Sequence, residues 1–383
     1  MGAFGAFRLG ANTLDGSAPY LTRIGQPETI PAEVSSRGMY VSVMINGQGP
    51  FRMQVDTGCS ISMITPEVAA AVEAHGLDTI ADEAQAINAL GDAVSIPRVM
   101  LDSVTLGGVQ FEGVIAGVVP LELQSRVDGR GLDGLLGYSL FSELFLVLDF
   151  PRQDLLLSQG RPEDLPPARA ELAIVEHGDV PFVDVRLQGR EFEVMVDTGS
   201  NDRLHLQPDQ VASLGWTVRP RPGFLVAVAG ETGRELVARL SGVLELGGLS
   251  QKEPVVGISD GPASIGVGLL HPFCLVFDGP GETLRLCSPD DGPLPSPSER
   301  SIGLSLLADV GGWRVAGIIP DSPAEAAAIG DGDLVTKIEG QPATRWNPDQ
   351  ILNWINSHPA IALSVLSKSG ERDIDLRTWP LVP

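Results

Sequence analysis

The chain has 383 residues and a formal net charge of −23, from 26 Lys and Arg residues against 49 Asp and Glu residues. This acidic balance argues against nucleic acid or an anionic membrane as a partner. Hydrophobic residues make up 43% of the sequence, which is enough for sizeable cores, and the length predicts two to four domains. The 45 Gly and 30 Pro residues favour short strands and many turns over long helices.

No run of 18 or more apolar residues occurs, so the sequence predicts no transmembrane helix. The first stretch, MGAFGAFRLGANTLDG, lacks the charged start and the continuous apolar core of a signal peptide. We therefore expect the protein either in the cytoplasm or, with an export signal removed, outside it.

A segment near the start of the chain occurs a second time. YVSVMINGQGPFRMQVDTGCS (40–60) aligns with FVDVRLQGREFEVMVDTGS (182–200). Each copy predicts a hairpin with a turn at Asn46-Gly47 or Gln188-Gly189, and its second strand runs into Asp-Thr-Gly. The two copies of this motif differ visibly where Cys59 stands in one and Ser200 in the other.

The similarity continues after the hairpins. A short helix is expected in each copy, at 65–76 with Thr65 as N-cap and Gly76 as its end, and at 207–215. Each copy then ends in a strand-turn-strand pattern, LVLDFPRQDLLL (146–157) or LVFDGPGETLRL (275–286). The repeat therefore covers a whole β domain.

These patterns divide the chain into six parts. We predict an N-terminal extension (1–35), a first lobe (36–160), a linker (161–171), a second lobe (172–288), a Pro-rich linker (289–300) and a C-terminal domain (301–383). The C-terminal domain is expected to be small and mixed α/β, because strands flank a helix at 347–358. Asn347 and Gln350 are placed to form a capping box at the start of that helix.

Three cysteines and five histidines show no metal-ligand spacing, so we expect no metal site. Cys274 and Cys287 flank two strands around a Gly-Pro-Gly turn and are expected to face each other across that hairpin. They form either two buried thiols or a disulfide. Each histidine is expected to be structural or on the surface.

The duplicated Asp-Thr-Gly motif predicts a pair of carboxyl groups. One copy alone would be weak evidence, because Asp and Gly are common in turns. A pseudo-twofold axis between duplicated domains would bring Asp56 and Asp197 together. Two close carboxylates do not both ionise easily, so one acts as a general base while the other keeps a proton and acts as a general acid.

The neighbouring residues fit this hypothesis. Gly58 and Gly199 allow a close approach of the backbone, and their N–H groups are free to support the carboxylates. The hydroxyls of Thr57 and Thr198 are placed to hydrogen-bond across the interface and hold the two loops in register.

With these motifs the chain resembles a retropepsin-like aspartic protease in which two lobes are fused. The matching residues are Val55, Asp56, Thr57 and Gly58, then Val196, Asp197, Thr198 and Gly199, and the later runs Leu135-Leu136-Gly137 and Ile265-Gly266-Val267-Gly268. The resemblance implies a mainly β fold of two β-barrel lobes that is active as a monomer. It implies peptide-bond hydrolysis by a water held between Asp56 and Asp197, with no metal, cofactor or covalent intermediate.

The chain departs from this family in two respects. Cys59 stands where such enzymes more often carry Ser or Ala, and the flap Tyr of pepsin-like enzymes is absent. Two glycine-tipped hairpins, AINALGDAV (86–94) and VAVAGETG (226–233), are either a pair of flaps or ordinary surface hairpins.

The C-terminal domain resembles a PDZ domain of the type appended to bacterial envelope proteases. The resemblance rests on Ile302-Gly303-Leu304, Ser322-Pro323-Ala324 and Gly330-Asp331-Gly332-Asp333. It implies that Ile302, Gly303, Leu304 and Ser305 hold a peptide C-terminus, with Ile351 on the helix at 347–358 as the opposite wall. By analogy it also implies a bacterial cell envelope or periplasm.

The sequence thus predicts an aspartic endopeptidase whose PDZ domain recruits or gates protein substrates. Two alternatives remain at this point: a non-catalytic peptide-binding adaptor, and an enzyme that is silent until its PDZ domain or flaps move. A degenerate, inactive protease would most simply have lost an Asp, and both are present.

Overall fold

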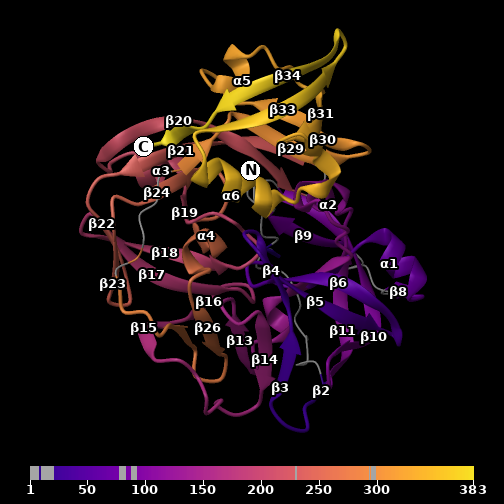
Figure 1. Cartoon of the computed structure of the whole chain (residues 1–383). Coiled ribbons are helices and arrows are strands. Elements are labelled where there is room, and N and C mark those ends of the chain that lie inside the picture. Colours follow the sequence, from indigo (N-terminus) through magenta and orange to yellow (C-terminus); the bar gives the residue numbers. More distant parts are fainter. Residues whose placement is uncertain are drawn as a thin grey trace.

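The computed structural model describes residues 8–9, 21–76, 83–87, 93–228, 231–292, 294 and 299–383. The chain is mainly β, as the sequence predicts, with β-barrel architecture. Its described strands form sheets of eleven, ten, six, six and two strands. In Figure 1 the eleven-stranded first sheet lies on one side and the ten-stranded second sheet on the other, with the C-terminal sheet above both.

The first and second sheets repeat the same arrangement. In the first sheet the neighbours are β7 (Ser62–Ile64), β12 (Gly134–Gly137), β6 (Gln48–Asp56) and β5 (Gly38–Ile45); in the second they are β19 (Leu204–Leu206), β25 (Ser264–Gly266), β18 (Arg190–Asp197) and β17 (Pro181–Leu187). The pairing register is also the same, since Gly137 lies opposite Asp56 and Gly266 lies opposite Asp197. The repeated sequence therefore forms a repeated structure.

Both predicted hairpin turns are present. Asn46 and Gly47 have φ values of 50° and 75°, and Gln188 and Gly189 have 52° and 76°. Two successive left-handed residues give the turn that matches the twist of paired strands, which explains why each turn carries glycine second.

The short helices begin where the sequence predicts. Thr65 caps α1 (Pro66–Ala71) by accepting a hydrogen bond from the Val68 N–H, and Gln207 caps α3 (Pro208–Val211). The predicted end of the first helix at Gly76 is wrong. The helix ends at Ala71, and β8 (His75–Gly76) instead pairs with β10, so tertiary pairing overrides local helix preference here.

The other strands of these two sheets surround this shared arrangement. The first sheet adds β1 (Arg8–Leu9), β2 (Leu21–Arg23), β4 (Glu33–Ser35), β9 (Glu83–Ile87), β10 (Ala93–Leu106) and β11 (Val109–Val118), and the second adds β16 (Val175–Glu176), β20 (Trp216–Val228), β21 (Glu231–Leu240), β22 (Val243–Leu246), β23 (Leu249–Lys252) and β24 (Val255–Ile258). The helical segments α2 (Glu122–Asp128), η1 (Tyr138–Leu140) and α4 (Val267–Leu270) connect them.

A six-stranded sheet joins the two repeats. Its order is β15 (Ala168–Ala173), β27 (Thr283–Cys287), β26 (Cys274–Asp278), β13 (Phe145–Asp149), β14 (Asp154–Ser158) and β3 (Glu28–Pro31). The closing hairpin of each repeat thus pairs with that of the other, with Val147 opposite Val276 at the centre. Cys274 lies opposite Cys287, and both are buried free thiols.

The C-terminal sheet encloses a separate hydrophobic core. It contains β29 (Leu304–Asp309), β30 (Gly312–Ile318), β31 (Leu334–Ile338), β32 (Gln341–Pro342), β33 (Ala360–Ser367) and β34 (Gly370–Arg377), with α5 (Pro323–Ala326), η2 (Ala343–Arg345) and α6 (Pro348–Ser357). Helix α6 begins with the predicted capping box of Asn347 and Gln350. A two-stranded sheet of β28 (Glu299–Ser301) and β35 (Trp379–Val382) lies beside it.

The C-terminal part of the chain contacts both repeats. Arg126 on α2 donates to the Ala308 carbonyl at 3.0 Å, and Asp349 on α6 accepts from the Ser36 N–H at 3.0 Å. On the side of the second sheet, Arg203 pairs with Glu299 at 3.2 Å and Arg234 donates to the Ile318 carbonyl at 3.2 Å. Figure 1 shows α6 between the C-terminal sheet and the rest of the chain.

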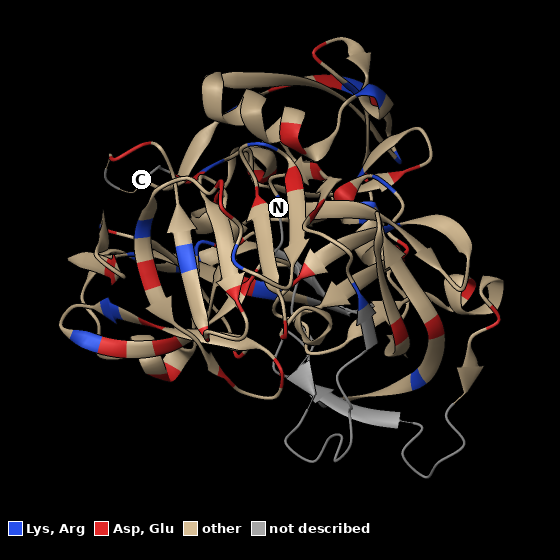
Figure 2. Ribbon diagram, turned by 90° about the horizontal axis from the view of Figure 1, so that it is seen from below, with Lys and Arg blue, Asp and Glu red and all other residues tan. Residues whose placement is uncertain are grey.

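Among the described residues, the helices are all too short or too polar to cross a lipid bilayer. Figure 2 shows acidic residues distributed over many elements of the fold. The strong negative charge of the chain therefore does not come from one acidic segment.

Candidate active site

The two Asp-Thr-Gly motifs lie at the ends of equivalent strands. β6 ends at Asp56 and β18 ends at Asp197, and each carboxyl-bearing residue is only 2% exposed. The neighbouring strands carry glycine beside each Asp for a steric reason. A Cβ atom on Gly137 would lie 2.4 Å from the Ile61 carbonyl carbon, and one on Gly266 would lie 2.6 Å from the Ser200 oxygen.

The two loops are joined by crossed hydrogen bonds between threonines. The Thr57 hydroxyl donates to the Val196 carbonyl at 2.6 Å and accepts from the Thr198 N–H at 3.1 Å. The Thr198 hydroxyl makes the reciprocal pair, to the Val55 carbonyl at 2.8 Å and from the Thr57 N–H at 3.1 Å. Both threonines are completely buried, so these bonds fix the relative position of the loops without competition from water.

Each aspartate is supported by the backbone of its own loop. The Gly58 N–H donates to Asp56 Oδ1 at 3.0 Å, and the N–H groups of Gly199 and Ser200 donate to Asp197 Oδ1 at 2.9 and 3.0 Å. The two carboxyls are close enough for each to shift the pKa of the other. Gly199 lies directly against Asp56, because a Cβ atom there would be 2.3 Å from the Asp56 carboxyl carbon.

The electrostatics of the pair follow from burial and proximity. Burial raises the pKa of Asp56 to about 7, although hydrogen bonds from Gly58 and with Asp197 oppose the rise. Burial also raises the pKa of Asp197 well above its usual value, and the nearby charge of Asp56 raises it further. A proton is therefore retained on the pair under conditions in which exposed aspartates are ionised.

Removing one threonine hydroxyl is expected to weaken the fold. Thr57→Val leaves the Val196 carbonyl and the Thr198 N–H buried without a partner, which costs about 2–4 kcal/mol. Urea unfolding followed by tryptophan fluorescence measures this loss. Thr29→Val, at an exposed position of β3, is the matched control and should change stability by less than about 0.5 kcal/mol. Equal stabilities of the two variants would contradict the structural role of the crossed bonds.

Cys59 and Ser200 occupy equivalent places but bond differently. The Cys59 thiol donates to the Ile61 carbonyl at 3.0 Å. The Ser200 hydroxyl accepts from the Asp202 N–H at 3.1 Å and also bonds the Asp202 side chain. The small size of Cys59 fits the buried loop.

Both flap candidates fall on β-hairpins. β9 pairs with β10 with Ile87 opposite Ala93, and β20 pairs with β21 with Val228 opposite Glu231. The tips of both hairpins lie outside the described residues. Their action as flaps stays a prediction.

The structure brings together part of the predicted peptide groove. Ile302, Leu304 and Ile351 line one cavity, whereas Gly303 and Ser305 are not part of its lining. Gly303 has a φ of 88°, and its N–H donates to the Ser301 hydroxyl at 2.8 Å. One edge of β29 is paired with no other described strand, because β29 stands at the end of the C-terminal sheet, and Leu304 and Leu306 of β29 line this cavity.

The same cavity contains charged residues that sequence reasoning missed. Asp202 and Glu235 line it, and His205 lies behind them with its Nε2 4.0 Å from Glu235 Oε1. A signal was present, because five positions after the Asp of the Asp-Thr-Gly motif the first copy has Ile61 and the second has Asp202. Cys59 and Ser200 are the predicted visible difference between the two motif copies, and that prediction does not extend to this later position.

Within the described part of the chain, no group of three or more His, Cys, Asp or Glu side chains is arranged to hold a metal ion. The site itself presents two close carboxyl groups, which can hold and exchange a proton.

Comparison with known proteins supports part of this account. Residues 41–140 match the family model of aspartyl proteases, a segment that includes Asp56 and its supporting strands but not Asp197. No curated protein matches the chain. One similar solved structure is the crystal structure of the HtrA3 PDZ domain bound to the phage-derived ligand FGRWV. It is 19% identical, with a TM-score of 0.19, and the match covers 21% of this chain and 86% of that one.

Proposed function

We propose that the chain is an aspartic endopeptidase of the retropepsin-like type, with two lobes in one polypeptide and Asp56 and Asp197 as its catalytic residues. The observation that carries this proposal is the close approach of the two buried aspartates across loops locked by Thr57 and Thr198, since each aspartate shifts the pKa of the other. The family match over residues 41–140 supports a peptidase independently of this geometry.

The mechanism follows from the shared proton. One carboxylate takes a proton from a water placed between the pair, and that water attacks the peptide carbonyl carbon. The other carboxyl donates its proton to the carbonyl oxygen, which gives a neutral tetrahedral diol. Collapse of the diol breaks the C–N bond as a proton passes to the leaving amine. Because the site is buried, the interaction between the two carboxyls is strong, so one stays ionised while the other stays protonated.

The C-terminal domain is proposed to be a PDZ domain that recruits or gates protein substrates. Its support comes from the residues around Ile302 and Ile351 that share a cavity with the free edge of β29. An extended peptide is the ligand that such an edge and an apolar helix face accept together.

The test is cleavage of an internally quenched peptide library by the purified chain, with and without a statine-type peptide that mimics the tetrahedral intermediate. An endopeptidase cleaves internal bonds and is inhibited. A peptide-binding adaptor binds library members without turnover and is indifferent to the inhibitor, so that result would overturn the proposal.

The pH range in which the chain cleaves peptides is expected to be higher than that of an enzyme whose two aspartates are exposed. Burial raises the pKa of Asp56 to about 7 and raises that of Asp197 as well. Because the mechanism needs one proton on the pair, kcat/KM rises as the first proton leaves and falls as the second leaves. Activity is therefore lost as the pH falls toward about 4, where both carboxyls are protonated.

The measurement is kcat/KM between about pH 3 and 9, with tryptophan fluorescence at each pH to separate titration from acid unfolding. An activity maximum below about pH 4 in the folded chain would contradict the raised pKa values of the buried pair.

A further inference from the structure

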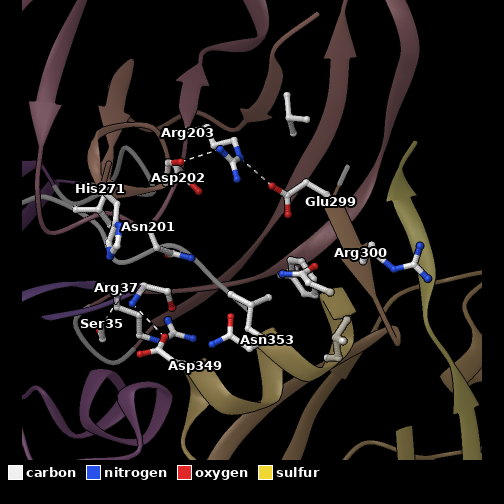
Figure 3. A pocket seen from close by; sticks show the side chains of 18 of the residues that line it. Ser35, Arg37, Asn201, Asp202, Arg203, His271, Glu299, Arg300, Asp349 and Asn353 are labelled. Atoms are coloured by element: carbon white, nitrogen blue, oxygen red, sulfur yellow. Dashed lines mark hydrogen bonds and ion pairs between the residues drawn. The ribbon is translucent and has the colours of Figure 1, made fainter. Parts of the chain in front are cut away.

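A cavity of about 990 Å³ lies where the C-terminal domain meets the second repeat and residues 34–37 and 150–153 of the first repeat. Figure 3 looks into it: Asp202, Arg203 and Glu299 lie on one side, and Asp349 and Asn353 of α6 lie on the other. The apolar residues Ile302, Leu304 and Ile351 also line it. The cavity therefore combines the free edge of β29 with a charged wall that begins beside the second Asp-Thr-Gly loop.

The carboxyls of that wall replace apolar side chains of the first repeat. Asp202 and Ile61 are equivalent, since their backbones pack in the same way against Gly266 and Gly137. His205 pairs with Gly257 as Met63 pairs with Gly117. Glu235 covers Gly257 as Ile96 covers Gly117. Because Ile61, Met63 and Ile96 are at most 2% exposed, apolar packing is sufficient at these positions and the charged residues are not required by the fold.

Glu235 has no cationic partner among the described residues. It is 6% exposed, and Gly257 makes room for its carboxyl, since a Cβ atom there would lie 1.9 Å from Glu235 Oε1. Burial raises the pKa of Glu235 well above its usual value, and the nearby charges of Asp202 and Glu299 raise it further. A pair of carboxyls of this kind, in which Glu235 is buried and Asp202 half-buried, is stabilised by a cation that enters the cavity.

His205 does not supply that cation. Its Nδ1 lies 2.9 Å from the Pro262 carbonyl, which only accepts hydrogen bonds, so Nδ1 carries the proton. Burial lowers the pKa of His205, which keeps the ring neutral. Its Nε2 therefore accepts from the Ser259 hydroxyl at 2.8 Å and has no proton to give to Glu235. Arg203 is also engaged, with Glu299 at 3.2 Å and the Gly268 carbonyl at 2.8 Å.

We propose that this cavity binds an extended peptide with an apolar C-terminal side chain between β29 and α6, and with a lysine side chain that reaches Asp202 and Glu235. The inference rests on the proposed peptide-binding role of the C-terminal domain and names its ligand class. The acidic wall, formed by Asp202 and Glu235, belongs to the second repeat. The selectivity of the groove therefore depends on a surface that an isolated C-terminal domain lacks.

The experiment uses the full chain carrying Asp56→Asn, so that bound peptides stay intact. Fluorescein-labelled peptides of alternating Gly and Ala end in Val and carry lysine, in turn, at each of the four positions before it. Each has a norleucine counterpart with the same stem and no charge. We expect one lysine position to bind about tenfold tighter than its norleucine counterpart, as fluorescence anisotropy measures it.

In the Asp56→Asn chain, a second substitution, either Glu235→Gln or Asp202→Asn, should reduce the preference for lysine over norleucine to below about threefold. The affinity for the norleucine peptide should stay the same. Glu245→Gln, at an exposed position of β22, is the matched control and should keep the preference. Equal binding of lysine and norleucine peptides would overturn this inference alone. Failure of every peptide to bind would overturn the peptide groove as well, and neither result depends on cleavage activity.

Discussion

Asp56→Asn is expected to reduce kcat/KM for peptide cleavage by about 10³-fold or more, and Asp197→Asn to do the same. Asn neither accepts the proton of the attacking water nor donates one to the carbonyl oxygen. Because the two carboxyls share one proton, the loss of either removes the acid–base pair as a unit. Steady-state cleavage of an internally quenched peptide measures the effect.

The folded structure should survive these changes. Asn has the shape of Asp, and its neutral side chain is easier to bury than a carboxylate, so the unfolding midpoint should stay equal or rise. Asp184→Asn, at an exposed position of β17, is the matched control and should retain full activity. Cleavage at the wild-type rate by either dyad variant would show that the aspartates are not the catalytic pair.

Gly199→Ala is expected to inactivate the enzyme although it removes no reactive group. The added methyl group would lie 2.3–2.5 Å from the carboxyl atoms of Asp56 and would force the two aspartates apart. A displacement of about 1 Å at a reacting centre costs about 10²-fold in rate, and we expect at least that loss in kcat/KM.

The control for this variant is Gly160→Ala, because a Cβ atom there meets nothing within 4 Å. It should cleave peptides as the wild type does. If Gly199→Ala remains within about threefold of wild-type activity, the close contact between the two loops is not needed for catalysis.

Much of this arrangement follows from local sequence patterns. Asn46-Gly47 and Gln188-Gly189 specify their turns by backbone preference alone, and Thr65 and Asn347 mark helix starts by their capping groups. The equivalence of Asp56 and Asp197 follows from the repeat. Their contact follows from it as well, because two copies of one domain that meet about a twofold axis bring equivalent loops together.

Other features depend on contacts between distant segments, and local patterns do not specify them. The first helix ends early because His75 pairs with Met100 on β10. On one side of the cavity lie Asp202 and Glu235, and the residues on the opposite side come more than sixty positions later in the chain. The set of residues that lines the cavity is therefore defined only once the domains are packed together. The local sequence contains one signal that the second repeat carries carboxyls where the first is apolar, namely Asp202 at the position of Ile61.

The most direct measurement of the central claim is a crystal structure of the chain with a statine-type peptide. The hydroxyl of such a peptide occupies the place of the attacking water in the tetrahedral intermediate. The proposed mechanism predicts that this one oxygen lies within hydrogen-bonding distance of both the Asp56 and the Asp197 carboxyls. A peptide bound elsewhere, or a hydroxyl that contacts neither aspartate, would contradict it.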